Sequence, residues 1–209
     1  MSPRLDLPIA IAAWLLGFLW VGLRGEWAPL ALLALAAAAR LVAFDPETRR
    51  LLRPSAAGLA LGGAGALGLI AATYGLYRPL SAVLPGLPGA TRDLYALLNA
   101  AGYQPATLGA SVLVMSVCEE VAWRGRTLTG SPMRAGAGRI DAPALARVGV
   151  VGLIYGAASL ASGSLVLFAL AAGCGIAWGL LRVVGRSLWP AIVAHALWDL
   201  AVLVGWPIA

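Results

Sequence analysis

Residues 56–77 read AAGLALGGAGALGLIAATYGLY, an uncharged stretch built mostly of Ala, Gly and Leu. An α-helix needs about 20 such residues to cross the hydrocarbon core of a bilayer, so this stretch predicts a transmembrane helix. Six further apolar runs lie between charges and turn residues and predict the same structure: 7–23, 27–44, 106–127, 144–161, 164–182 and 188–206. The sequence therefore predicts an all-α, polytopic bundle of about seven transmembrane helices.

The composition agrees with a chain whose solvent is mostly lipid. Of its 209 residues, 61% are hydrophobic and 11% are charged, and the mean hydropathy is +0.87. A water-soluble domain of this size carries far more charge. Helices with short connections use nearly the whole chain, so we expect residues 1–209 to form a single integral membrane domain.

All 15 basic residues are arginines, and the formal net charge is +6. These charges punctuate the apolar runs, so we interpret them as orientation signals and expect no nucleic-acid partner. Arginines gather in residues 45–54 and 130–143, which the positive-inside rule assigns to the cytoplasm. This choice predicts a cytoplasmic N-terminus and an external C-terminus.

Two shorter features complete the organisation of the chain. Residues 78–105 contain several Pro and Gly and then an amphipathic piece, 91–103, which we expect to lie on the external membrane surface or to cap a cavity. Cys118 and Cys174 each lie in an apolar run without a second Cys or a His at metal-ligand spacing. We therefore expect neither a disulfide nor a metal site.

Ionisable residues inside a membrane helix are costly and therefore mark candidate functional sites. In the run 106–127, Glu120 and Arg124 are four residues apart and can form an ion pair on one helical face. Glu119 is rotated from Glu120 by about 100°, so it can face a wet cavity and act as a general base. The alternative is a helix end with an acidic pair, at which Arg124 and Arg126 snorkel to water.

The run 188–206 contains the only histidine of the chain, His195, four residues before Asp199. A lone histidine on an apolar helix is more often a buried structural residue, but the neighbouring carboxyl group favours a functional pair. At 1.5 Å of rise per residue, Glu119 and His195 both lie on the order of 10 Å below the cytoplasmic surface. We therefore expect these two side chains to share one hydrated pocket.

The two segments resemble the CPBP family, which comprises CAAX proteases and bacteriocin-processing enzymes and includes Ras-converting endopeptidase. One element is Glu-Glu-x-x-x-Arg, beginning at Glu119. The stronger element is Ser-Leu-Trp-Pro-Ala-Ile-x-x-His-x-x-x-Asp at residues 187–199. Together they indicate a family-like catalytic core at 106–206.

The resemblance implies a metal-independent glutamic intramembrane protease that uses no cofactor. It implies that Glu119 activates a water molecule with structural support from Glu120 and Arg124, and that His195 with Asp199 stabilises the oxyanion. We expect three aromatic residues near these motifs to line the substrate pocket: Trp123, Tyr155 and Trp198.

The chain departs from the family pattern at one position. Relatives carry a second histidine four residues after an aromatic residue on the intervening helix, where this sequence has Tyr155 and Ser159. Three interpretations are consistent with the change: His195 alone suffices, Ser159 holds the water by hydrogen bonding, or proteolysis has been lost. A Ser159 nucleophile using His195 is a minor option, because no rhomboid-like Gly-x-Ser-Gly element accompanies it.

We therefore expect an intramembrane endopeptidase in the inner (plasma) membrane of a bacterium, a source favoured by the absence of Lys and the abundance of Ala, Gly and Arg. Its expected partners are the lipid bilayer and a peptide or membrane-anchored protein, cleaved in a leader or a C-terminal tail. The sequence does not predict the oligomeric state. The competing interpretation is a noncatalytic membrane scaffold or immunity protein that binds a partner helix in the same cavity.

Overall fold

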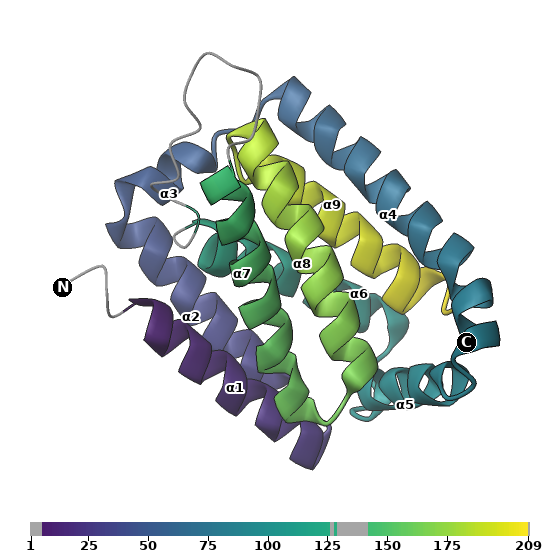
Figure 1. The fold of residues 1–209 in the computed structure, drawn as a ribbon. Coiled ribbons are helices and arrows are strands. Elements are labelled where there is room, and N and C mark those ends of the chain that lie inside the picture. Colours follow the sequence, from purple (N-terminus) through teal and green to yellow (C-terminus); the bar gives the residue numbers. More distant parts are fainter. Residues whose placement is uncertain (1–5, 126–127, 129–141, 209) are drawn as a thin grey trace.

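The computed structural model describes residues 6–125, 128 and 142–208. All regular secondary structure in these residues is helical, which confirms the predicted all-α fold (Figure 1). The described α-helices are α1 Asp6–Arg24, α2 Ala28–Phe44, α3 Pro46–Leu51, α4 Ala56–Val83, α5 Leu87–Asn99, α6 Pro105–Glu119, α7 Ala142–Ser159, α8 Leu165–Gly185 and α9 Trp189–Asp199. Three short segments extend them: the π-helices η1 Glu120–Gly125 and η3 Leu200–Gly205, and the 3₁₀ turn η2 Leu160–Ser162.

The apolar helices of the structure correspond to the predicted runs. Four are long and apolar enough to cross a membrane: Ala56–Val83, Pro105–Gly125, Ala142–Ser162 and Leu165–Gly185. Shorter apolar helices cover the remaining runs: Ile11–Arg24, Ala28–Phe44 and Trp189–Gly205. Large apolar side chains such as Leu16, Leu67 and Leu153 are exposed, as expected for a bundle that faces lipid. The protein is therefore a membrane-embedded, polytopic helical bundle.

The boundaries of several elements differ from those predicted. α4 continues beyond residue 77 to Val83, through Pro79. Membrane helices tolerate an internal proline when neighbouring groups satisfy the freed backbone carbonyl. The short helix α3 lies between two predicted spans and begins where the Asp45 side chain accepts a hydrogen bond from the backbone N–H of Glu47. This cap explains why the polar connection forms a helical turn.

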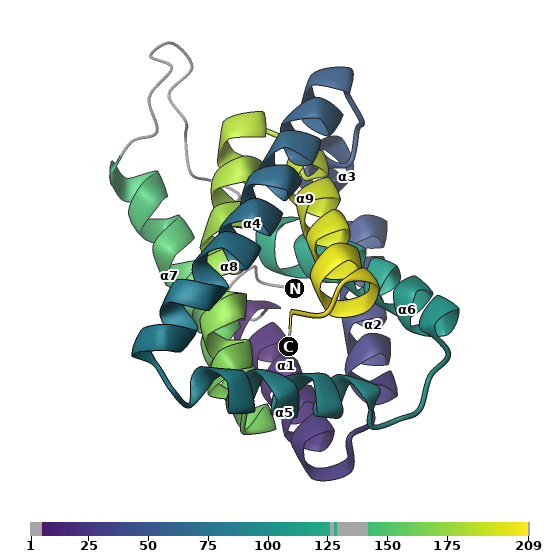
Figure 2. The same ribbon diagram turned by 90° about the vertical axis from the view of Figure 1, so that its right-hand side faces the viewer.

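The other helices surround much of α9, whereas α6 runs at one side of the bundle and is buried mainly near its C-terminal end (Figures 1 and 2). α7 packs along α8, α1 packs along α2, and α4 covers α9. α5 runs across the end of the bundle at which α4 ends and α6 begins (Figure 2). This arrangement leaves α6 and α9, the two helices with candidate site residues, in contact with each other.

Two glycines of α7 set its close approach to α8. A Cβ atom at Gly156 would lie 2.8 Å from the backbone nitrogen of Ala172. A Cβ atom at Gly152 would lie 2.9 Å from the backbone nitrogen of Ile176. Small residues are enriched at membrane helix interfaces because tight packing drives association where lipid removes the hydrophobic driving force.

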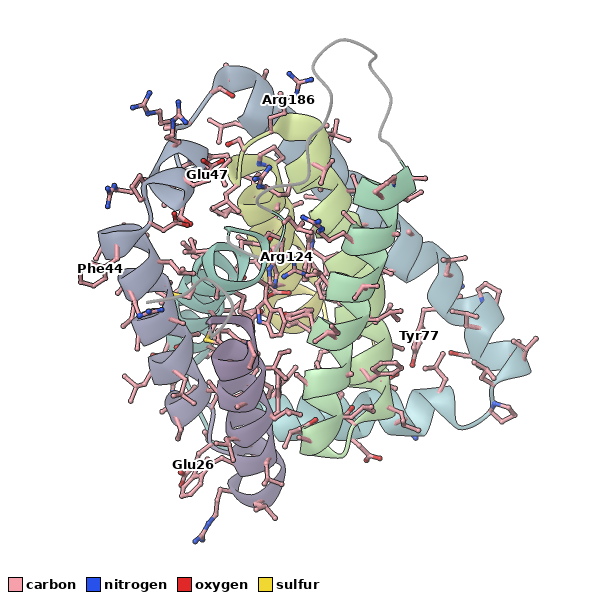
Figure 3. The ribbon with its side chains drawn as sticks, turned by 60° about the vertical axis from the view of Figure 1, so that its left-hand side comes forward. Glu26, Phe44, Glu47, Tyr77, Arg124 and Arg186 are labelled. Carbon is pink, nitrogen blue, oxygen red and sulfur yellow. The ribbon has the colours of Figure 1, made fainter. Side chains whose placement is uncertain are left out.

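Charged residues distinguish the two ends of the bundle. Figure 3 shows Glu47 and Arg186 toward one end and Glu26 toward the other, with Arg124 between them in the interior. In the predicted cytoplasmic segment 130–143, Arg134 and Arg139 lie outside the described residues. The orientation in the membrane therefore stays a prediction.

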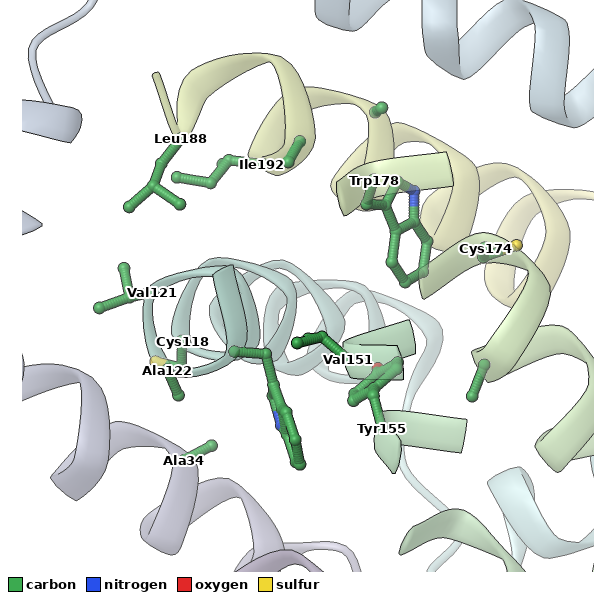
Figure 4. Packing of buried hydrophobic residues seen from close by; sticks show 14 of the residues in the cluster. Ala34, Cys118, Val121, Ala122, Val151, Tyr155, Cys174, Trp178, Leu188 and Ile192 are labelled. Atoms are coloured by element: carbon green, nitrogen blue, oxygen red, sulfur yellow. The ribbon is translucent and has the colours of Figure 1, made fainter. Parts of the chain in front are cut away.

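The apolar core extends from α1 and α2 across α6 to α7, α8 and α9, and it includes Ala34, Val151 and Trp178 (Figure 4). Cys118 and Cys174 lie on opposite sides of the residues drawn there, and both are free. Neither forms a disulfide, as predicted.

Candidate active site

Two π-helical segments begin directly after candidate site residues. α6 ends at Glu119, and η1 carries Glu120 and Arg124. α9 ends at Asp199, where η3 follows without a break. π-helical turns are rare and occur frequently at functional sites. The apolar periodicity of the sequence contains no signal for them.

The side chain of Glu119 is buried, and each oxygen of its carboxyl group accepts a hydrogen bond. The Tyr155 hydroxyl donates to Oε2 at 2.6 Å, and Nε1 of Trp14 donates to Oε1 at 3.3 Å. Nε2 of His195 lies 3.8 Å from Oε2. Glu119 and His195, from two different helices, are therefore direct neighbours.

Both ring nitrogens of His195 face carboxylate oxygens. Nδ1 lies 2.9 Å from Oε1 of Glu120, and Nε2 lies 3.2 Å from Oδ2 of Asp199. When both nitrogens carry hydrogen, both contacts are charge-assisted hydrogen bonds. The Ser116 hydroxyl donates to the same Asp199 oxygen at 3.0 Å, and the Trp178 ring stacks on the imidazole with centroids 3.5 Å apart. These contacts fix both the position and the rotation of the ring.

Glu120 and Arg124 form the predicted ion pair, with Nη1 and Oε1 3.1 Å apart and neither side chain exposed. Nη2 of Arg124 donates to the backbone carbonyl of Gly175 at 3.1 Å. The guanidinium also lies over the Tyr155 ring, 4.5 Å from its centroid. The alternative in which Arg124 snorkels to water is therefore wrong, because interior partners hold its charge; Arg126 lies outside the described residues.

The polar side chains described above form one cluster: Glu119, Glu120, Arg124, Tyr155, His195 and Asp199. This cluster borders a cavity of about 420 Å³. Four of its ionisable or hydroxyl side chains line the cavity: Glu119, Tyr155, His195 and Asp199. Glu120 and Arg124 do not line it and lie behind His195. The cavity thus places the Glu119 carboxyl group and the His195 imidazole side by side, which is a pairing that general acid–base chemistry uses.

Away from the cluster, the cavity is lined mainly by apolar residues from several helices. Leu32 of α2 and Val114 of α6 both line the cavity and are exposed, which indicates that the cavity reaches the surface of the bundle beside these helices. Leu94 and Leu98 of α5 are buried and line the opposite part. Of the two placements predicted for the amphipathic segment, the structure supports the cap over a cavity.

The structure does not bring Ser159 into the cluster. Its buried hydroxyl donates to the backbone carbonyl of Gly156 at 2.7 Å, and Ser159 is not among the residues that line the cavity. Helical serines commonly satisfy their hydroxyl on a preceding carbonyl in this way. Tyr155, one turn earlier on α7, is the residue that reaches Glu119. This geometry does not support the interpretation in which Ser159 holds the water.

Two of the three aromatic residues predicted for the substrate pocket, Tyr155 and Trp198, line the cavity. Nε1 of Trp198 donates to the hydroxyl of Thr73 at 2.9 Å. Trp123 is buried behind the cavity wall, where its ring packs edge-on between Trp14 and Tyr155 at centroid distances of 5.6 Å and 5.4 Å. Trp123 does not line the cavity, because its ring packs against Trp14 of α1 and Tyr155 of α7.

The segment that holds the cluster matches a known protein family. Residues 102–201 match the model of a protein family that is described as type II CAAX prenyl endopeptidase Rce1-like. Residues 102–201 belong to the CPBP family of CAAX-type proteases. The resemblance drawn from the two sequence elements is thereby confirmed, and the CAAX protease description assigns the segment to the endopeptidases. No curated protein and no solved structure gave a match to the chain.

The CAAX protease segment does not contain the whole site. Trp14 and the cavity residues of α1, α2 and α5 precede it. Ser116, Gly175 and Trp178 lie inside it but were not predicted. A Ser, Gly or Trp in an apolar run carries no charge that marks it as part of a site, so these contacts could not be predicted from the residue types alone.

The described cluster offers no evident place for a metal ion. Among residues 6–125, 128 and 142–208, no group of three or more His, Cys, Asp and Glu side chains is arranged to hold one.

Proposed function

We propose that this protein is an intramembrane endopeptidase in which Glu119 activates the water that hydrolyses a peptide bond. The observation that carries the proposal is the contact between Glu119 and His195, whose Oε2 and Nε2 atoms are 3.8 Å apart on the wall of a largely apolar cavity. The membership of residues 102–201 in a family of endopeptidases supports the same type of reaction.

Glu119 is the general base of this proposal. Its carboxylate takes a proton from water, and the water oxygen bonds to the carbonyl carbon of the substrate to form a tetrahedral oxyanion. When the carbon–nitrogen bond breaks, Glu119 returns the proton to the leaving nitrogen, so that one water molecule yields a carboxyl group and an amine. General acid–base catalysis of this kind contributes about 10²–10⁴-fold to the rate.

His195 is the donor that we assign to the oxyanion. Its Nε2 lies beside Glu119 on the cavity wall, and Asp199 holds it at 3.2 Å. Because Nε2 carries a single hydrogen, this N–H must exchange Asp199 for the oxyanion as its acceptor when the charge develops, while the ring stays in place. Glu120 orients the imidazole through Nδ1, and Arg124 offsets the charge of Glu120, which makes both of them supports of the donor.

The cavity favours an apolar substrate anchored in the membrane. An apolar segment that enters beside Leu32 and Val114 would cover the apolar lining while its peptide bond reaches the cluster. A peptide or the C-terminal tail of a membrane-anchored protein has this chemistry. The family description adds a prenylated tail as a specific candidate.

We assign the activity to the plasma membrane of a bacterium, with the N-terminus in the cytoplasm. The basis is the sequence composition and the arginines around α3, Arg49, Arg50 and Arg53. The proposed reaction uses no metal and no cofactor, since Glu119 supplies the base and His195 the donor.

The test is cleavage by the purified protein in liposomes, in the presence of a metal chelator. Two quenched-fluorescent probes cover the substrate classes: a farnesylated peptide that ends in a CAAX box, and an unprenylated peptide with an apolar C-terminal tail. We expect the wild type to cleave at least one probe and Glu119→Gln to cleave it at least about 100-fold more slowly.

Equal cleavage by the wild type and Glu119→Gln would overturn the proposed mechanism. Loss of cleavage on adding chelator, with recovery on adding back a divalent metal, would overturn metal independence. Binding of either probe without cleavage by the wild type would support the noncatalytic scaffold, which is the competing interpretation of the sequence.

A further inference from the structure

We infer that Tyr155 and Trp14 are positioning residues that aim the Glu119 carboxylate at its water. This inference rests on the proposed function, because it concerns how the general base is held. It assigns a role to α1, which lies outside the segment that belongs to the CAAX-type protease family.

Each carboxylate oxygen of Glu119 has its own hydrogen-bond donor, and the two donors come from different helices. Tyr155 of α7 donates to Oε2 at 2.6 Å, and Trp14 of α1 donates to Oε1 at 3.3 Å. Two donors on two oxygens fix the plane of the carboxylate, whereas a single donor leaves it free to rotate. Hydrogen bonds to a charged acceptor are stronger and more directional than neutral ones.

Both donors, Tyr155 and Trp14, are held in place by packing against neighbouring side chains. Trp14, Trp123 and Tyr155 form a row of edge-to-face rings, with centroid distances of 5.6 Å and 5.4 Å. The Arg124 guanidinium lies over the Tyr155 ring, 4.5 Å from its centroid. Trp14 is fully buried and Tyr155 nearly so. Edge-to-face aromatic contacts and a cation over the ring each add to the packing that holds the donors in place.

The Glu119 carboxyl group lies between Tyr155 and the proposed oxyanion donor, His195. Oε2 accepts from Tyr155 and also lies 3.8 Å from Nε2 of His195. This distance between Oε2 and Nε2 is too long for a direct hydrogen bond. A shift of the Glu119 carboxyl group toward Tyr155 or toward His195 would change the geometry between the general base and the oxyanion donor. Small displacements of reacting groups cost large factors in rate, which makes the two donors important for turnover.

The experiment compares Tyr155→Phe and Trp14→Phe with the wild type and with Glu119→Gln, using the better cleaved of the two probes. Both variants keep an aromatic ring; Tyr155→Phe removes only the hydroxyl group, whereas Trp14→Phe removes the indole N–H together with one ring of the buried side chain. We expect kcat to fall about tenfold for Tyr155→Phe, the loss that a hydrogen bond to a charged group commonly produces, and KM to stay within about twofold. Tyr74→Phe is the matched control, since the Tyr74 hydroxyl donates to the Trp206 backbone carbonyl and Tyr74 does not line the cavity.

A second readout follows the carboxyl group itself and needs no substrate. The infrared band that disappears in Glu119→Gln identifies the Glu119 carboxyl group. We expect this band to shift in Tyr155→Phe and in Trp14→Phe and to stay unchanged in Tyr74→Phe, because only the first two lose a donor to Glu119.

The outcomes separate this inference from the proposed function. An inactive Glu119→Gln together with unchanged kcat and an unshifted band in Tyr155→Phe would overturn the inference and leave the proposed function standing. A fully active Glu119→Gln would overturn the proposed function. If Tyr155→Phe or Trp14→Phe unfolds, the infrared comparison with the remaining folded variant decides the inference.

Discussion

Oε2 of Glu119 lies 3.8 Å from Nε2 of His195, although α7 and α8 separate their helices along the chain. Both side chains are buried and line the same cavity. Two ionisable groups surrounded by apolar helices need a shared polar environment, which Tyr155 and Asp199 provide here. This relationship turns two separate sequence elements into one candidate site.

Filling the cavity should block the substrate without changing the cluster. Ala31 of α2 lines the cavity, so Ala31→Trp places an indole in the space proposed for the apolar segment. We expect KM to rise by about tenfold or more with little change in kcat, the pattern of lost substrate binding. Ala36→Trp is the control, because Ala36 is exposed on the same helix and does not line the cavity. Equal KM values for the two variants would contradict the assignment of the cavity to substrate.

The buried ion pair should matter chiefly for stability. Arg124→Met leaves Glu120 charged and buried without its counter-charge, so we expect the free energy of unfolding to fall by about 3–5 kcal/mol. Denaturant unfolding in detergent micelles, followed by circular dichroism, measures the change. The double variant Glu120→Gln with Arg124→Met should recover part of the loss, because no unpaired charge remains. An Arg124→Met protein as stable as the wild type would contradict the pairing.

Close packing of α7 on α8 should depend on Gly156. A Cβ atom there meets the backbone of Ala172, which cannot move aside as a flexible side chain can. We expect Gly156→Ala to lower the free energy of unfolding by about 1–3 kcal/mol, the usual cost of overpacking. Gly173→Ala on α8 is the control, since no atom lies within 4 Å of its added Cβ, and it should leave stability unchanged or slightly raised. The reverse order of the two stabilities would show that the helices are packed differently.

The Ser159 hydroxyl should be dispensable for cleavage. It donates to Gly156 and does not line the cavity, so Ser159→Ala is expected to keep kcat/KM within about threefold of the wild type, the effect of losing one ordinary hydrogen bond. The measurement is probe cleavage with and without a serine-directed reagent. Abolished activity in Ser159→Ala, together with inhibition by that reagent, would instead favour a serine nucleophile.

Much of the fold could be predicted because lipid restricts it. A helix that crosses the bilayer must be apolar over a certain length, so the apolar runs correspond closely to the helices. The pairs Glu120–Arg124 and His195–Asp199 could be predicted as well, because residues four apart lie on one helical face.

The contacts between helices could not be predicted in the same way. Which residue of α1 or α7 meets Glu119 depends on how those helices pack and rotate, and a single sequence does not specify this. Tyr155 was predicted as a pocket residue but not as a donor to Glu119, and Trp14 was not predicted at all. Ser159 occupies the expected helix, yet its hydroxyl bonds within that helix.

The most direct test of a single Glu119–His195 site is a double-mutant cycle on the rate of probe cleavage in one turnover. Residues that act as a unit are strongly non-additive, because removing either one already removes the shared step. We predict that Glu119→Gln combined with His195→Ala cleaves no more slowly, within about threefold, than the slower of the two single variants. A double variant whose loss equals the product of the two single losses would contradict the account.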